Sequence, residues 1–168
     1  MRSQQEKLKK ELIKLGTGEF VAVVSFWLCF FIMKTWIVDS KMMLLILYPL
    51  FVLSFILIQG SIYWFILLKR ISNPSFLIKY TGNTYRILRV IDAALLCMGF
   101  LIFLKNGSNL IVKALSVFLL LFSCIEWINY YIVRLSYSYD PTVLIRHIKN
   151  KTLKKSKIAK EIDKSIDY

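Results

Sequence analysis

Polar and ionisable side chains recur at helical spacing in the last long apolar stretch of the chain. Glu126 lies inside this stretch, and Ser116, Ser123, Tyr130 and Arg134 fall on the same side of a helix at 100° per residue. A carboxylate among apolar residues can hold a proton, bind a cation or a polar substrate, or pair with a basic side chain. Glu126 is therefore the first candidate for a functional residue.

Further polar residues lie in the two preceding apolar stretches. Arg89 and Asp92 are three residues apart, a spacing at which a helix brings side chains together. At a rise of 1.5 Å per residue, Asp92, Gln59 and Glu126 lie about 7, 14 and 12 Å from the basic ends of their stretches. We predict one cytosol-facing polar cluster, and its members are Gln59, Arg89, Asp92, Glu126, Asn129 and Arg134.

Two interpretations of this cluster stay open. In the structural one, interhelical hydrogen bonds and ion pairs fix the register of the helices. In the functional one, the cluster binds a substrate, a proton or an ion. We favour the structural interpretation because the apolar stretches show no sign of a discontinuous helix, and we expect Arg89 or Arg134 to pair with Glu126.

The elements that must position these residues are membrane-spanning helices. The chain has 168 residues, of which 57% are hydrophobic, and the apolar residues come in blocks. These blocks contain about 20 residues each, which is the length that crosses a hydrocarbon core of about 30 Å. We predict an all-α, integral membrane four-helix bundle with spans at residues 19–38, 43–68, 87–104 and 110–135.

The distribution of lysine and arginine predicts the orientation of the bundle. Most of the 23 basic residues lie in residues 2–14, between the second and third spans, or from residue 134 onward. The other side of the predicted spans has only Lys34, Lys41, Lys105 and Lys113. Basic loops stay in the cytoplasm, so both termini should be cytoplasmic. The net charge of +13 flanks the apolar blocks and does not form one basic face, and we therefore expect no nucleic-acid partner.

The two ends of the chain are predicted to be basic and amphipathic. Residues 1–18 should form a short helix that ends at Gly16 and lies along the inner leaflet near anionic headgroups. The alternative is a basic tail that only fixes the topology. Residues 136–168 should form a basic cytoplasmic tail in which Ile158, Ile162 and Ile166 have helical spacing. This tail is either a short surface helix or a segment that is disordered until it binds.

Motifs for catalysis or cofactor binding are not found in the sequence. Cys29, Cys97 and Cys124 lie in three different spans without a C-x-x-C pair, so we interpret them as small apolar residues. His147 is the single histidine, which excludes a multi-histidine metal site. A phosphate-binding glycine loop and a G-x-S-x-G motif are also missing. We expect no catalytic residues, no metal and no cofactor, and we favour a protein that is not an enzyme.

The segment E-W-I-N-Y-Y-I-V-R-L-S-Y, residues 126–137, precedes a basic K-x-L-K-K-S tail. This layout resembles small four-span membrane proteins of low-GC Gram-positive bacteria that remain uncharacterised. The resemblance implies a bacterial plasma membrane and brings no activity or site residues with it.

Two classes of function follow from the sequence. The first is an accessory or interaction protein of the plasma membrane, whose partners are anionic lipid headgroups and either another protein or a second copy of the chain. The alternative is a small carrier or channel subunit that works through the polar cluster between the helices.

Overall fold

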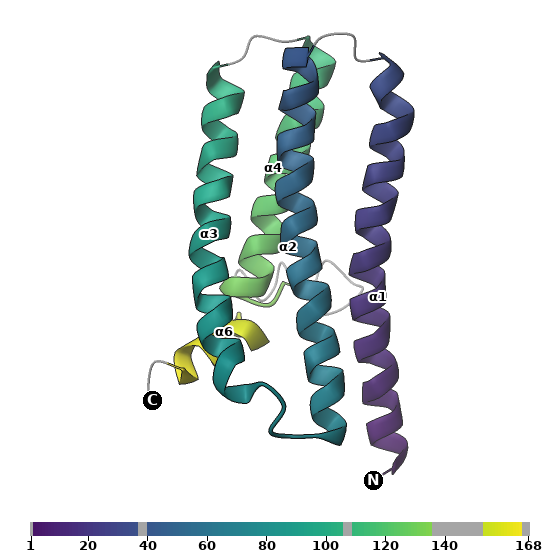
Figure 1. Ribbon diagram of the computed structural model, residues 1–168, viewed down its shortest axis with the longest axis vertical. Coiled ribbons are helices and arrows are strands. Elements are labelled where there is room, and N and C mark those ends of the chain that lie inside the picture. The colour runs from purple at the N-terminus through teal and green to yellow at the C-terminus, as the bar shows by residue number, and fades with distance from the viewer. Residues whose placement is uncertain (1, 37–39, 106–108, 136–152, 166–168) are drawn as a thin grey trace.

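The protein is mostly helical in the residues that its computed structural model describes, which are 2–36, 40–105, 109–135 and 153–165. Four long helices follow one another as antiparallel columns, and a short helix crosses one end (Figure 1). The elements are α1 (Arg2–Met33), the 3₁₀ turn η1 (Lys34–Trp36), α2 (Ser40–Ser72), α3 (Ile78–Lys105), α4 (Leu110–Tyr131) and α6 (Lys157–Lys164). The predicted all-α class with four long apolar helices is confirmed.

Each of the four long helices contains a segment that is long and apolar enough to cross a membrane. These segments are Gln4–Met33, Met42–Ser72, Tyr80–Lys105 and Leu110–Tyr131. The second and third helices extend toward each other beyond the predicted limits of residues 68 and 87, and only residues 73–77 connect them. The fourth helix ends at Tyr131, four residues before its predicted end.

The first helix does not end at Gly16, which corrects the expectation of a separate N-terminal helix. One continuous helix runs from Arg2 to Met33. Gly16 faces α2, where the Ser61 hydroxyl donates to the Gly16 carbonyl oxygen at 2.8 Å. A Cβ at Gly16 would lie 3.1 Å from the ring of Phe65. Because the glycine is packed against α2, the helix continues through it.

The second helix is the centre of the bundle. In the most apolar 18-residue segment of α2, 56% of the residues are buried. The corresponding segments are 17% buried in α1 and α3 and 22% buried in α4. Leu53 and Val52 are neighbours in α2, yet they belong to two different apolar clusters of the core. The Leu53 cluster joins α2 to α1 and α4, whereas the Val52 cluster joins α2 to α3, α4 and α6.

Large apolar side chains cover the outward faces of the other three long helices. The exposed fractions are 71% for Ile32, 67% for Val90, 76% for Leu104 and 80% for Leu110. Water-soluble monomers rarely expose apolar surface on this scale. Such faces are suited to contact with lipid.

The start of α1, the α2–α3 connection and α6 lie at the same end of the bundle, which we call the basal end (Figure 1). The short helix is fixed there from its first turn. Ser156 is the N-cap of α6, and its hydroxyl accepts from the Ala159 N–H at 2.9 Å and donates to the Tyr130 carbonyl oxygen. Just before this cap, Val133 and Lys155 form an isolated antiparallel bridge.

The short C-terminal helix is docked on the bundle and is not a free surface helix. Ile158 and Ile162, whose spacing predicted a helix, are each only 3% exposed and belong to the core cluster with α2, α3 and α4. Gly82 in α3 permits this docking, because a Cβ there would lie 2.7 Å from the Glu161 carbonyl oxygen. Ile166 and His147 lie outside the described residues.

Candidate functional site

The structure places the polar residues of the bundle in three groups instead of one cluster. A core group contains Gln59 and Asp92. A cavity group contains Glu126, Asn129 and Arg134, together with residues that the sequence did not predict. A third group fastens α6 at the basal end. Arg89, the sixth predicted residue, has an exposed side chain and belongs to none of them.

The core group connects α2, α3 and α4 around the side chain of Gln59. The Gln59 Nε2 donates to Asp92 Oδ1 at 2.9 Å, and the Tyr131 hydroxyl donates to Gln59 Oε1. The Tyr85 hydroxyl donates to the backbone oxygen of Gln59 at 2.8 Å. Asp92 is fully buried, and its Oδ2 has no hydrogen-bond partner among the described residues. Since this group is closed off from solvent, we assign it a structural role.

Glu126 has an amide partner in place of the predicted ion pair. Asn129 Nδ2 donates to Glu126 Oε2 at 3.3 Å, and the Asn129 side-chain oxygen accepts from the Leu135 N–H at 2.9 Å. Between described residues, ion pairs connect Arg70 to Glu161 and Lys155 to Asp163, and neither includes Glu126.

Two features of the structure explain why the observed partner of Glu126 differs from the predicted Arg89 or Arg134. The side chain of Arg89 is exposed on α3, and its backbone oxygen accepts from the Trp127 indole N–H at 3.2 Å. The fourth helix ends at Tyr131, so Arg134 no longer follows the helical stripe that aligned it with Glu126. Arg134 and Glu126 still line the same cavity.

This cavity has a volume of about 420 Å³ and lies between α1, α2, α4 and α6. On the side away from the basal end, Phe26 of α1 meets Phe122 of α4 with ring centres 5.9 Å apart. The lining residues are Leu8, Glu11, Leu12, Leu15, Gly18, Glu19, Ala22, Leu57, Tyr63, Trp64, Phe122, Glu126, Asn129, Tyr130, Arg134, Ser156, Lys157 and Ile158. The wall is thus apolar and aromatic with a small number of ionisable groups, which is the usual composition of a small-molecule site.

Glu19 brings a second carboxylate into the cavity beside Glu126. Its Oε1 accepts from the Trp64 indole N–H at 2.6 Å, while its Oε2 is buried without a hydrogen-bond partner among the described residues. Gly60 makes this arrangement possible, because a Cβ on Gly60 would overlap both Glu19 Oε2 and the Tyr130 hydroxyl. Because Gly60 has no side chain, polar groups of α1 and α4 can meet against α2.

Two basic residues, Arg134 and Lys157, line the cavity where α6 borders it. The ammonium nitrogen of Lys157 lies 5.6 Å from the centre of the Trp64 ring, within the range of a cation–π interaction. Burial lowers the pKa of Lys157 from its usual value, and the positive charge of Arg134 lowers it further. The same indole ring therefore contacts a carboxylate at its N–H and a cation over its face.

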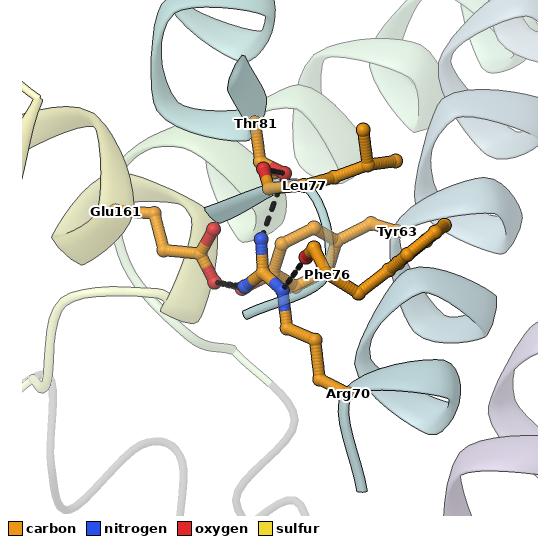
Figure 2. Close-up of polar contacts among 6 residues, drawn as sticks. All are labelled: Tyr63, Arg70, Phe76, Leu77, Thr81 and Glu161. Carbon is orange, nitrogen blue, oxygen red and sulfur yellow. Dashed lines mark hydrogen bonds and ion pairs between the residues drawn. The ribbon is translucent and has the colours of Figure 1, made fainter. Parts of the chain in front are cut away.

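The third polar group holds α6 at the basal end of the bundle (Figure 2). The Arg70 Nη1 pairs with Glu161 Oε1 at 2.7 Å, and the Tyr63 hydroxyl donates to the same oxygen at 2.9 Å. The rest of the guanidinium donates to the Phe76 carbonyl oxygen at 2.9 Å and to Thr81 Oγ1 at 2.7 Å. One arginine thus connects α2, the α2–α3 connection, α3 and α6.

Several residues of these groups are not predicted by the sequence patterns, although some signals are present. Glu19 was placed at the start of a span, yet it is the single carboxylate in residues 12–38 and could have been treated as Glu126 was. Arg70 was counted only as a charge that sets topology. Glu161 is one acidic residue in a lysine-rich segment, and no local pattern connects it to Arg70.

The described residues offer little for metal or redox chemistry. They contain no group of three or more His, Cys, Asp or Glu residues that could hold a metal ion. Cys29, Cys97 and Cys124 are free thiols.

No protein family, curated protein or solved structure matches this chain.

Proposed function

We propose that this is a multi-pass protein of the bacterial plasma membrane with both termini in the cytoplasm. The four apolar helices, their exposed apolar faces and the basic residues around the basal end support this orientation. From Met42 to Gly60 the second helix rises about 27 Å, close to the thickness of a hydrocarbon core. The cavity beside Gly60 then lies near the inner interface of the membrane.

Labelling of single cysteines in intact cells tests the orientation. In a variant without the three native cysteines, Gln4→Cys and Lys160→Cys should not react with an impermeant maleimide added outside. Asn109→Cys, between α3 and α4, should react. Gln4, Lys160 and Asn109 are all exposed, so burial does not explain a negative result. The reverse labelling would place the basal end outside the cell.

In this orientation the protein acts as a small carrier or ligand-binding subunit, and the cavity is its site. The observation that carries this proposal is that Glu19 and Glu126, from two different helices, line one cavity rather than pairing with cations among the described residues. If the cluster served packing alone, side chains would fill its space and its polar atoms would all be hydrogen-bonded. This is nearly the case in the Gln59 group. A cavity of this volume and composition suits a small molecule.

Filling the cavity should abolish ligand binding. Gly18 lines the cavity, and a Cβ there would meet nothing within 4 Å, so Gly18→Phe places a ring in the space without a backbone clash. In detergent, a panel of small cationic, neutral and anionic aromatic compounds should contain members that raise the unfolding temperature of the wild type. A rise of about 5–11 °C is expected at 100 times the Kd. Gly18→Phe should show no rise.

The matched control is Ala94→Phe, which adds the same ring on an exposed position of α3. It should respond to ligands as the wild type does. Equal responses of the wild type and Gly18→Phe would exclude the cavity as the site.

A second candidate function, as an accessory or interaction protein, is favoured by the first turns of α1. Leu8, Ile13 and Leu15 are 42–44% exposed there and lie among lysines. Such a surface binds anionic lipid headgroups or an acidic protein partner. Recovery of a stoichiometric partner, or of a second copy of the chain, with the tagged protein from native membranes would support this function.

A further inference from the structure

We propose that the cavity takes an organic cation, an ammonium group with an apolar substituent, and that Lys157 of α6 competes with this cation for the Trp64 ring. The inference rests on the proposed function of the cavity as a ligand site. It names the charge and the chemical class of the ligand, and it assigns a role to the lysine that borders the site.

The cavity wall carries three carboxylates, Glu11, Glu19 and Glu126, against two basic residues, Arg134 and Lys157, so a positive ligand or protons would balance its charge. Glu19 and Glu126 are each bound to a neutral donor, Trp64 and Asn129 respectively, and neither takes part in an ion pair within the described ranges. Glu19 Oε2 is buried next to the Tyr130 hydroxyl, and no cation is paired with it among the described residues. A carboxylate that is removed from water and left uncompensated is costly, and a cation between the two carboxylates would offset that cost.

The aromatic wall favours an organic cation. Trp64 and Tyr130 line the cavity next to Glu19, and indole is the best of the aromatic rings for a cation–π interaction. The chain itself shows that an ammonium group fits here, because Lys157 Nζ lies 5.6 Å from the centre of the Trp64 ring.

The remaining wall favours a ligand with an apolar substituent. Leu12, Leu15, Ala22 and Leu57 also line the cavity. A bare metal ion would leave this surface uncovered, whereas an apolar group attached to the ammonium would cover it. Two sources have this chemistry, namely a soluble amine from the cytoplasm and the ethanolamine headgroup of a phospholipid in the inner leaflet.

Lys157 stands where such a cation would approach the ring. It is the first residue of α6, which the Arg70–Glu161 pair fastens to the bundle, so its ammonium group is held near the cavity by the fold. Its long side chain can move away while α6 stays docked. Ligand and Lys157 therefore exclude each other from the face of Trp64 without any change in the backbone.

Calorimetric titration of the full-length protein in dodecyl maltoside tests the inference. The probes are phenethylammonium, the neutral 2-phenylethanol and the anionic 3-phenylpropionate. The cation should bind at least about tenfold more tightly than the other two, since 1.4 kcal/mol of charge interaction is a factor of ten. Glu126→Gln keeps the shape and a hydrogen-bonding group and should weaken binding of the cation about tenfold.

Lys157→Met removes the competing charge at similar length and should tighten binding of phenethylammonium two- to fivefold. Lys160→Met, on the exposed side of the same helix, is the matched control and should leave binding unchanged. An unchanged or weaker affinity of Lys157→Met would overturn the competition. This variant removes no buried contact of α6, so it remains informative if Glu126→Gln folds poorly.

The remaining outcomes separate the inference from the proposed function. Preferential binding of the neutral or the anionic probe, lost in Gly18→Phe, would keep the cavity as a ligand site and overturn its assignment to a cation. If none of the three probes binds, both the assignment to a cation and the proposed function of the cavity are overturned. If phosphatidylethanolamine in the micelles weakens phenethylammonium binding and phosphatidylglycerol does not, the cation is the lipid headgroup. If neither lipid competes, it is a soluble amine.

Discussion

Replacing Gln59 with leucine is expected to lower the free energy of unfolding by about 2–4 kcal/mol, because two buried groups lose their partner at once. Asp92 Oδ1 would lose the Gln59 Nε2 donor, and the Tyr131 hydroxyl would lose the Gln59 Oε1 acceptor. Leucine has a similar size, so the loss would come from the hydrogen bonds and not from a cavity. Denaturant unfolding in mild detergent, followed by tryptophan fluorescence, measures the effect.

A variant that removes the partners as well separates hydrogen bonding from packing. In Gln59→Leu/Asp92→Leu/Tyr131→Phe no polar group of the set remains unpaired, so most of the lost stability should return. If the single Gln59→Leu variant unfolds as the wild type does, the core group does not stabilise the bundle. The Asp92 carboxylate would then become a candidate functional group.

The number, order and apolar character of the long helices could be predicted from the sequence because they depend on length and composition. An apolar block of about 20 residues specifies a helix that can cross a bilayer. The ends of the helices could not be predicted in this way, since hydropathy marks only where the apolar run stops. The second helix continues to Ser72 through Lys69, whose charged group can reach the aqueous side, and Arg70, whose guanidinium is paired with Glu161.

The residues of the candidate site could be predicted better than their arrangement in space. The depth of each residue along its span grouped Gln59 with Asp92, and they do meet. It did not fix how the four helices are rotated against one another. Gln59 and Gly60 are adjacent and therefore point about 100° apart. Gln59 faces the core group, whereas Gly60 faces Glu19 and Tyr130 at the cavity, so the single predicted cluster becomes two groups.

Contacts between distant segments account for what sequence patterns missed. Glu161 binds Arg70 and Tyr63, which precede it by 91 and 98 residues. Periodicity relates residues within a helix and carries no information about such a pair. The same holds for Trp64 and Glu19, which are 45 residues apart and meet only because Gly60 lets the helices approach.

The second large effect is expected when Arg70 is replaced with leucine, which removes the polar attachment of α6. The side chains of Arg70 and Glu161 are only 13% and 23% exposed, so the loss leaves a largely buried carboxylate without its cation. We expect the free energy of unfolding to fall by about 2–4 kcal/mol, below the cost of breaking a fully buried pair because some solvent reaches this one. Thermal unfolding in detergent measures the change.

An exposed ion pair between Lys155, just before α6, and Asp163 of α6 provides the matched control. Lys155 and Asp163 also approach to 2.7 Å, but their side chains are 65% and 50% exposed. Lys155→Ala should therefore change stability by less than about 0.5 kcal/mol. A double-mutant cycle of Arg70→Leu with Glu161→Gln should give a coupling energy of about 1 kcal/mol or more. Arg70→Lys keeps the charge but loses the planar fork that also holds Phe76 and Thr81, so it should recover only part of the stability.

The loss at Arg70 should appear first as release of α6, before the long helices unfold. Helices of fewer than about 12 residues are marginal in water, so the eight residues of α6 depend on contacts with the bundle. In Arg70→Leu, trypsin should therefore cut at Lys160 and Lys164 faster than in the wild type, while the four long helices stay intact. Unchanged cleavage together with zero coupling to Glu161 would show that burial of Ile158 and Ile162 alone docks α6. Faster cleavage would identify Arg70 as the group that keeps Lys157 beside the cavity.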